Sequence, residues 1–271
     1  MFKVAAKWCG AVVTPVVAVA ILAALSTSPA QAKHDPNPAV FPPDAKMYGK
    51  TYSQWADSWW QWVDGIPKSA SPLIDPTGAD CAEGQSGPVW FLAGSPTGSY
   101  ERSCTIPKNK ALFLPVSNFQ EDQREAVPDY AFFGSVDCPG VYGSDFCDTA
   151  YDLLSPDPTD PAAMLAFINF VTDSFIDIGA KYATIDGEPV ADLADYRAPS
   201  GPKGYKIRLP RTDDPLDNYH TIFGYAFPGP DTYHGVQDGY YLMLSPLSKG
   251  EHTVSFGEAP DWAITYHLTV K

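Results

Sequence analysis

The sequence has little positive charge. It contains 18 lysines and arginines against 32 aspartates and glutamates, which gives a formal net charge of −14. Proteins that hold a nucleic acid cluster lysines and arginines on one surface. The nearest approach to such a cluster stands beside two aspartates and comprises Lys203, Lys206, Arg208 and Arg211. A solvated strand face explains these residues, and no nucleic-acid partner is expected.

Common catalytic motifs are missing as well. The chain has no G-x-S-x-G, H-E-x-x-H, G-x-x-x-x-G-K or G-x-G-x-x-G segment. These motifs supply a nucleophile on a sharp turn, a histidine pair for zinc, or a loop that holds phosphates. No internal repeat is visible either, which argues against a propeller or a solenoid. Nucleotide chemistry is therefore not expected.

Long apolar runs are confined to the N-terminus. Lys3 and Lys7 precede the apolar run from Ala11 to Leu25, and Ala30-Gln31-Ala32 has the small-x-small pattern of a signal-peptidase site. This pattern predicts a signal peptide over residues 1–32 and a secreted or periplasmic protein. An uncleaved anchor is the alternative, but Thr14 and Pro15 interrupt the run, which is shorter than the roughly 20 residues that a membrane-spanning helix needs.

A second membrane span is not expected either. The best later candidate, Met164 to Ile178, is interrupted by Asn169, Asp173 and Asp177. No stable membrane insertion is therefore predicted once the signal peptide is removed.

Cysteines are few, and one of the five, Cys9, lies in the predicted signal peptide. An even number remaining in an exported chain indicates disulfides, because the compartments outside the cytosol are oxidising. Of the three pairings that four cysteines allow, the sequential one is favoured because it closes two local loops: Cys81 with Cys104, and Cys138 with Cys147. A zinc site is the alternative, but the usual C-x-x-C spacing is absent.

After the signal peptide, residues 33–46 are polar and rich in proline, which predicts an extended arm. Residues 47–271 are expected to form a single globular β-rich domain. Two helices are predicted in it. Asp160-Pro161 is a cap followed by a proline at the first helical position, so one helix should run from there to Gly179.

The other predicted helix runs from Tyr52 to Asp64 and carries four tryptophans. At 100 degrees per residue its aromatic side chains share one face, which usually packs on a sheet. Trp60 and Trp62 lie at opposite edges of this face. Either of them, if exposed, would offer a flat apolar surface for a ligand, and both are therefore candidate binding residues.

The rest of the domain reads as β. Runs rich in β-branched and aromatic residues recur between turns: Val89 to Ala93, Ala111 to Val116, Lys181 to Ile185, Tyr205 to Leu209, His220 to Phe227, Tyr240 to Leu244, Glu251 to Phe256 and Trp262 to Val270. Asp186-Gly187 is a preferred hairpin turn. The pattern predicts a mainly β fold, an antiparallel two-layer sandwich of immunoglobulin-like or jelly-roll-like type with two helices packed on it.

Several segments carry a resemblance. They are Gly84 to Gly94 (GQSGPVWFLAG), Arg102 to Thr105 (RSCT), Lys110 to Asn118 (KALFLPVSN), Asp238 to Tyr241 (DGYY) and Pro246 to Thr253 (PLSKGEHT). Together they make the chain similar to a family of uncharacterised secreted bacterial proteins. The resemblance implies export and a single shared fold, and no catalytic residue follows from it.

A group of polar residues follows the predicted strand at Ala111: Asn118, Gln120, Glu121, Asp122, Arg124 and Glu125. Carboxylates at the end of a buried strand can act as general acid and base, because burial and a neighbouring like charge shift their pKa values. Glu121 is the candidate catalytic residue, and Asn118 and Arg124 are candidate binding residues. A solvated turn in which Arg124 pairs with Glu121 is the alternative.

The histidines give weaker indications. His220 and His234 could meet across a loop and assist Glu121, whereas His252 follows a turn and is expected to be structural. No metal site is predicted. Calcium is the one cofactor left open, because loop carboxylates suit it: Asp75, Asp80, Asp213, Asp214 and Asp217.

Three functions fit these observations. The first is an exported protein that binds a glycan or a neutral or cationic small molecule through aromatic and acidic surface. The second is a hydrolase or lyase acting on a glycan or another polymer, with Glu121 assisted by His220 or His234. The third is a structural interaction module of the cell envelope.

Overall fold

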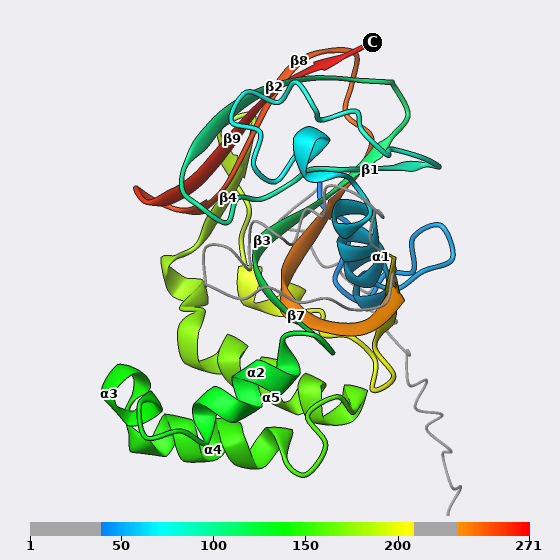
Figure 1. Cartoon of the computed structure of the whole chain (residues 1–271). Helices are drawn as coiled ribbons and strands as arrows, with labels where there is room; N and C mark the ends of the chain where they lie inside the picture. Colours follow the sequence, from blue (N-terminus) through cyan, green and yellow to red (C-terminus); the bar gives the residue numbers. More distant parts are fainter. Residues whose placement is uncertain (1–38, 209–231) are drawn as a thin grey trace, which may run out of the picture. The chain divides into compact units, whose positions relative to one another are not determined.

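The computed structural model describes residues 39–208 and 232–271. The predicted signal peptide and His220 lie outside the described residues. The first of the two described sheets has the strand order β1-β3-β7-β6, and β1, β3 and β7 are labelled in Figure 1. Its strands are β1 (Val89–Phe91), β3 (Ala111–Asp122), β7 (Thr232–Leu244) and β6 (Tyr205–Arg208). Strands β3, β7 and β6 pair antiparallel, whereas β1 runs parallel to β3.

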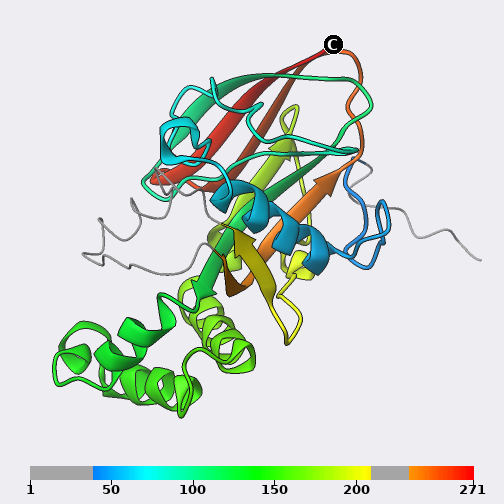
Figure 2. The ribbon, with the colours of Figure 1, turned by 45° about the vertical axis from the view of Figure 1, so that its right-hand side comes forward.

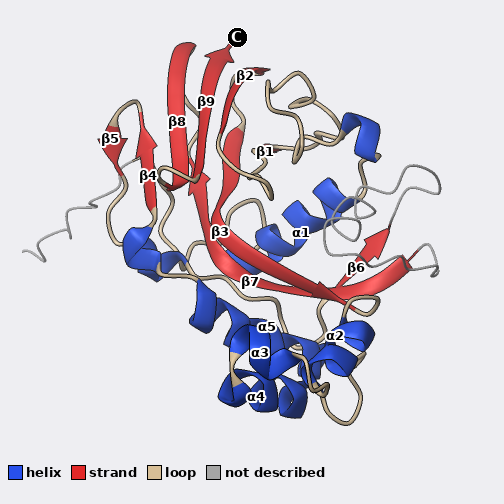
Figure 3. Ribbon diagram, turned by 60° about the vertical axis from the view of Figure 1, so that its left-hand side comes forward, coloured by secondary structure: helices blue, strands red, loops and turns tan. Residues whose placement is uncertain are grey.

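The second sheet has the order β2-β9-β8-β4-β5, with its strands side by side in Figure 3. They are β2 (Tyr100–Ile106), β9 (Trp262–Val270), β8 (Gly250–Glu258), β4 (Tyr182–Ile185) and β5 (Glu188–Pro189). Strand β2 is parallel to β9 and the other pairs are antiparallel. Apolar side chains of both sheets belong to one hydrophobic core, including Phe113, Leu242, Phe256 and Tyr266.

The predicted fold class is therefore confirmed in part. The described chain is mainly β, with helices packed on two sheets. The purely antiparallel arrangement is wrong for β1 with β3 and for β2 with β9. The chain passes from β1 into β2 of the other sheet before it returns as β3, and such a crossover brings it back in the same direction. Residue patterns report which face is buried, and they carry no information on strand direction.

The first predicted helix is confirmed with the same bounds, α1 (Tyr52–Asp64). Thr51 and Gln54 form a capping box at its start, which satisfies free backbone N–H groups of the first turn. Its aromatic face packs in the main core, against the sheet that holds β3 and β7 (Figure 2).

Four helices follow β3 in the chain and form a helical group. They are α2 (Ala126–Phe133), α3 (Cys138–Tyr142), α4 (Ser144–Leu154) and α5 (Pro161–Phe175). Only α5 was predicted, and it ends four residues before Gly179. Its Ile168 and Met164 pack with Val236 of β7, which joins the helical group to the first sheet (Figure 1). A separate apolar cluster built around Phe133, Leu154 and Phe167 holds the helices together.

Both predicted disulfide pairs are present. Cys81 is joined to Cys104, and Cys138 to Cys147, with 6.0 Å between the Cα atoms in each pair. The first links the loop after α1 to β2, and the second links α3 to α4. Disulfides are typical of oxidising compartments. Within the described ranges, no helix combines the length and the apolar character that crossing a bilayer requires.

Several boundaries differ from the prediction. Strand β3 extends to Asp122, because β7 pairs with it along the whole polar segment, down to Asp122 opposite Gly235. The described end of the predicted arm is extended but docked, since Val40 is buried and the N–H of Phe41 donates to the carbonyl of Met243. The Asp186-Gly187 hairpin joins β4 to β5, and both turn residues have positive φ.

Candidate functional site

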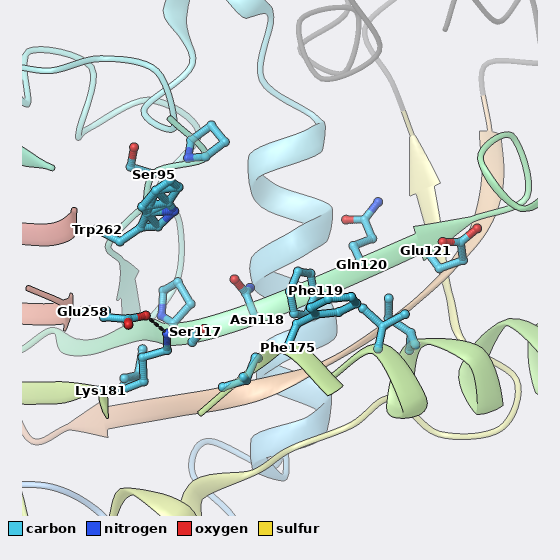
Figure 4. A pocket seen from close by; sticks show the side chains of 18 of the residues that line it. Ser95, Ser117, Asn118, Phe119, Gln120, Glu121, Phe175, Lys181, Glu258 and Trp262 are labelled. Atoms are coloured by element: carbon cyan, nitrogen blue, oxygen red, sulfur yellow. Dashed lines mark hydrogen bonds and ion pairs between the residues drawn. The ribbon is translucent and has the colours of Figure 1, made fainter. Parts of the chain in front are cut away.

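A cavity of about 870 Å³ lies between strand β3 and the helical group (Figure 4). Strand β3 contributes seven successive residues to it, from Pro115 to Glu121. Helices α2 to α5 supply another wall, and the ends of β8 and β9, residues 94–96 and Lys181 also line the cavity. Strand β1 pairs with β3 only as far as Phe113. Beyond that point no strand of the described chain covers this edge of β3, and the cavity lies beside the uncovered part.

The walls are mainly aromatic. Rings from β3 and from all four helices of the group line the cavity: Phe119, Phe132, Phe133, Tyr142, Phe146, Phe167 and Phe175. They contact one another, as in the pair Phe133 and Phe167, whose ring centroids are 5.3 Å apart. Three lining aromatics are also half exposed, namely Tyr142 (47%), Phe175 (49%) and Trp262 (49%). They form an aromatic rim where the cavity meets solvent.

Three carboxyl groups from two adjacent elements line the cavity. Glu121 belongs to β3, while Glu125 and Asp129 lie at the cap and in the first turn of α2. Only 3% of Glu121 is exposed, and its Oε1 atom has no hydrogen-bond partner among the described residues. Most buried polar atoms have such a partner, so this oxygen can accept a hydrogen bond from a molecule in the cavity.

The surroundings raise the pKa values of all three carboxyl groups. Burial raises the pKa of Glu121 well above its usual range, and nearby Asp129, Glu125 and Asp122 add to the effect. Burial, followed by the charge of Asp122, raises the pKa of Asp129 to about 7. Burial and the same like charges also raise the pKa of Glu125, against the opposing charge of Arg124. All three shifts favour the protonated carboxyl groups, and a cation close by would oppose them.

Arg124 does not serve this site. Its Nη2 atom lies 2.9 Å from Oδ2 of Asp122, and its backbone N–H donates to Oδ1 of the same residue at 2.6 Å. Arg124 is buried and is not among the residues that line the cavity. The predicted binding role of Arg124 is therefore corrected to a structural one. Its partner is Asp122 and not Glu121, because successive residues of a strand point to opposite faces of the sheet.

Asn118, a predicted binding residue, lines the cavity and also contacts the core. Its Nδ2 donates to the hydroxyl of Tyr241 at 3.0 Å. Gly239 lies opposite Asn118 in β7, and a Cβ atom there would come within 2.5 Å of the Asn118 Cβ. Glycine at this position lets the two strands approach closely beneath Asn118.

The other end of the cavity carries an ion pair. The ammonium group of Lys181 pairs with the carboxylate of Glu258, and the two lie near Ser117 in Figure 4. Trp262 and Ser95 lie further along, away from Glu121 (Figure 4). The cavity thus has an acidic end at Glu121 and an opposite end where Lys181 is paired with Glu258.

The predicted pairing of Glu121 with His234 is not assembled in this cavity, and His220 lies outside the described residues. Val236 lies directly opposite Glu121 in the neighbouring strand, and His234 is two residues from Val236. The side chains of Glu121 and His234 are therefore on the same face of the sheet. His234 nevertheless does not line the cavity, and its Nδ1 atom is buried without a partner in the described chain. His252 has the expected structural role, because its ring contacts Asp186 at 2.7 Å and the carbonyl of Ser248 at 2.9 Å.

Trp60 and Trp62 are not exposed, which corrects their prediction as a binding surface. Their exposed fractions are 6% and 8%. Trp60 donates to the hydroxyl of Tyr241 at 3.1 Å, and Trp62 donates to the carbonyl of Glu83 at 2.9 Å. The aromatic face of α1 is wide enough for both edges to reach the core, so neither ring offers a stacking surface.

One of the calcium ligands suggested by the sequence, Asp75, is committed to other bonds. Asp75 accepts hydrogen bonds from the backbone N–H groups of Thr77 and Asp80 and from the Thr77 hydroxyl. Asp213, Asp214 and Asp217 lie outside the described residues. Across residues 39–208 and 232–271, no group of three or more histidines, cysteines, aspartates or glutamates is arranged to hold a metal ion.

Sequence reasoning missed most of the cavity. It singled out Glu121 and Asn118 but neither the aromatic wall nor Trp262. One available signal was the spacing of Glu125 and Asp129, which places two carboxyl groups on one face of a helix. The rest comes from elements far apart in the sequence, which only the fold brings together.

Comparisons with known proteins add nothing to this description. No protein-family model, no curated protein and no solved structure matches the chain. The resemblance to secreted bacterial proteins therefore stays a prediction.

Proposed function

We propose that this chain is an exported protein that binds a small organic molecule in the cavity between β3 and the helical group. The observation that carries the proposal is the cavity itself, about 870 Å³ in volume with a mainly aromatic lining. Cavities of roughly 300 to 1,000 Å³ are the usual size of small-molecule sites. Such sites combine apolar walls with polar groups, and the polar groups here include Asn118, Glu121 and Asp129.

The aromatic rim supports the same function. About half of the surface of each rim residue is exposed to solvent: Tyr142, Phe175 and Trp262. Exposed apolar rings cost free energy in water, and stable folds usually avoid grouping them on the surface. A ligand that covers these rings on its way into the cavity recovers this cost. If the ligand is a glycan, its sugar rings cannot stack on Trp60 or Trp62, because both are buried. Trp262 is the half-exposed tryptophan of the cavity lining on which they can stack.

Export is part of the proposal. The N-terminal pattern of residues 1–32 predicts a signal peptide, and the two disulfides are those of an oxidising compartment. A purely structural role in the cell envelope has no specific observation in its favour, because it would not need a large cavity with an unpartnered carboxyl group.

A neutral fluorescent probe tests the binding function. N-phenyl-1-naphthylamine brightens when it leaves water for an apolar site, and we expect saturable binding to the mature protein. Val171 lines the cavity from α5, so Val171→Phe should fill part of the space and weaken probe binding at least tenfold. Ser117→Phe fills it from β3 and should act in the same way.

The matched control is Val127→Phe. Val127 is 51% exposed on α2 and is not among the lining residues, so this change should leave probe binding unaltered. Melting temperatures establish that each variant is folded. Absence of saturable binding, or equal binding by folded Val171→Phe, Ser117→Phe and unchanged protein, would contradict the proposal.

A hydrolase or lyase is the second candidate, and one observation favours it. Burial and like charges raise the pKa values of Glu121 and Asp129 within one cavity, and carboxyl groups that stay protonated near neutral pH can act as general acids. A panel of glycan and other polymer substrates should then give turnover that Glu121→Gln abolishes. Turnover that survives this change would exclude Glu121 as the acid.

A further inference from the structure

We propose that the molecule held in this cavity is an organic amine, whose ammonium group contacts Glu121 while its apolar body lies on the aromatic wall. The inference rests on the proposed function and specifies the chemical class of its ligand. It depends on the charges that line the cavity, on the hydrogen bonding of Glu121 and on the rings beside it.

The lining is strongly acidic. Five of its side chains are carboxyl groups and one is a cation: Glu121, Glu125, Asp129, Glu258 and Asp261, against Lys181. Lys181 pairs with Glu258 at the far end, and Arg124 is bonded to Asp122 outside the lining. No cationic side chain of the described lining therefore neutralises Glu121. An ammonium group supplied by a ligand would provide the missing charge.

Glu121 is placed to accept that group. It is almost fully buried, and its Oε1 atom lacks a hydrogen-bond partner in the described part of the chain. A buried carboxyl oxygen without a partner costs free energy, and the cost is removed when a ligand donates to it. Hydrogen bonds between an ammonium group and a carboxylate are about twice as strong as neutral ones, so the amine gains most from this position.

Other ligand classes fit less well. A carboxylate or phosphate ligand would place a further negative charge beside three acidic groups. This is unfavourable because little water is present to screen the charge. A neutral alcohol can hydrogen-bond Glu121 but cannot form an ion pair with it. The aromatic wall also favours a cation, because ring faces attract ammonium groups, most strongly where water is excluded.

Amine binding should release protons. In the empty cavity burial and like charges favour the protonated carboxyl groups, whereas the ammonium group stabilises the ionised carboxylate in their place. Each carboxyl group that ionises transfers its proton to the buffer, while the amine keeps its own. The net reaction is therefore uptake of a cation with release of up to one proton per carboxyl group, and a neutral ligand should release none.

Three matched probes test the inference by calorimetry at pH 7: phenylbutylamine, phenylbutanol and phenylbutyrate. They share an apolar body and differ in the charge of the end group. We expect the amine to bind at least tenfold more tightly than the alcohol, and the butyrate more weakly than both. Titrations in two buffers of different ionisation enthalpy should reveal proton release for the amine alone.

Variants assign the effect to Glu121. Glu121→Gln should remove the preference for the amine while phenylbutanol still binds. Glu101→Gln makes the same change on an exposed residue of β2 outside the cavity and should leave the preference intact. If Glu121→Gln does not fold, Asp129→Asn serves as the second variant, and it should reduce both the preference and the proton release.

The outcomes separate the two proposals. If the alcohol binds and the amine shows no preference, the cavity is a binding site but the amine inference is wrong. The inference is likewise wrong if the preference persists unchanged in folded Glu121→Gln. If none of the three probes and no neutral fluorescent probe binds, the proposed function fails together with it.

Discussion

The indole N–H of Trp60 donates a hydrogen bond to the hydroxyl of Tyr241 at 3.1 Å, across 181 positions of the chain. The same hydroxyl accepts from Asn118 at 3.0 Å and donates to Gln237 at 2.7 Å. Tyr241 is fully buried and its ring stacks on Phe113, with centroids 5.5 Å apart. One hydroxyl therefore connects α1, β3 and β7 beneath the floor of the cavity.

Tyr241→Phe removes this hydroxyl and keeps the ring. Three polar groups would lose a partner; those of Trp60 and Gln237 are buried and that of Asn118 is half-buried. Each unsatisfied buried group costs about 1 to 3 kcal/mol, partly recovered by local rearrangement. We expect the free energy of unfolding to fall by about 2 to 4 kcal/mol, measured by urea denaturation. Tyr240→Phe is the matched control, because the Tyr240 hydroxyl makes no hydrogen bond within the described residues. Equal effects of the two changes would contradict the network.

Arg102 is the second buried centre, and it bonds mostly to backbone. Only 1% of it is exposed, and its guanidinium donates to the Tyr266 hydroxyl and to four carbonyls, those of Leu73, Asp75, Ala93 and Gly94. It thereby fixes two loops against β9. Lysine cannot reproduce this planar set of donors.

Arg102→Lys should consequently destabilise the fold by about 3 kcal/mol or more, because several buried carbonyls lose their donors and a charge stays buried. Urea denaturation measures the effect. Arg208→Lys, on an exposed residue of β6, should change the free energy of unfolding by less than about 0.5 kcal/mol. A loss below about 1 kcal/mol for Arg102→Lys would show that the carbonyls find other donors.

The elements that could be predicted from the sequence are those whose buried face is uniformly apolar. Helix α1 and strand β9 have such faces, and both were predicted with the observed bounds. Strand β2 was missed because Arg102 points inward, where its charge interrupts the apolar alternation that identifies a strand. Glu121 interrupts β3 in the same way, so the strand was expected to end before it.

The helices α2, α3 and α4 were missed for a different reason. Helix α3 spans five residues and contains Pro139, and α2 has aromatic residues on several sides, so neither shows a clear helical period. These helices are stabilised by contacts with α5 and by the Cys138–Cys147 disulfide, which lie outside their own short sequences. The cavity depends on them, and for that reason its lining could not be predicted.

The two disulfides should differ in their contribution to stability. A cross-link restricts the unfolded chain, and the restriction grows with the length of the closed loop. The cysteines are 23 residues apart in the first pair and 9 in the second. The entropy model then gives about 3.4 kcal/mol for Cys81–Cys104 and about 2.6 kcal/mol for Cys138–Cys147.

Replacing Cys81 and Cys104 together by serine should therefore lower the free energy of unfolding more than replacing Cys138 and Cys147. Chemical denaturation of both double variants checks the order. Thiol titration of the denatured mature protein, without reductant, should find no free thiol, and four free thiols would refute both bonds.

The acidic end of the cavity should make stability depend on pH. Glu121 and Asp129 have raised pKa values in the folded chain, the latter about 7, whereas unfolded carboxyl groups release their protons near pH 4. Between about pH 4 and pH 7 the folded state thus binds more protons than the unfolded state. The free energy of unfolding must then fall as the pH rises, by up to about 1.4 kcal/mol per pH unit for each retained proton.

Asp129→Asn removes one of these protons and should make the decline from about pH 5 to about pH 7 shallower than in the unchanged protein.

The His252–Asp186 pair contributes its own decline as the pH rises. Partial burial opposes protonation of His252, but the hydrogen bond to Asp186 outweighs this and raises its pKa. That contribution is the same in both proteins and cancels in the difference. Asp148→Asn changes an exposed aspartate of α4 and should leave the slope unchanged. Urea denaturation at three pH values in this range measures all three proteins, and parallel curves for Asp129→Asn and the unchanged protein would show that Asp129 is ionised throughout.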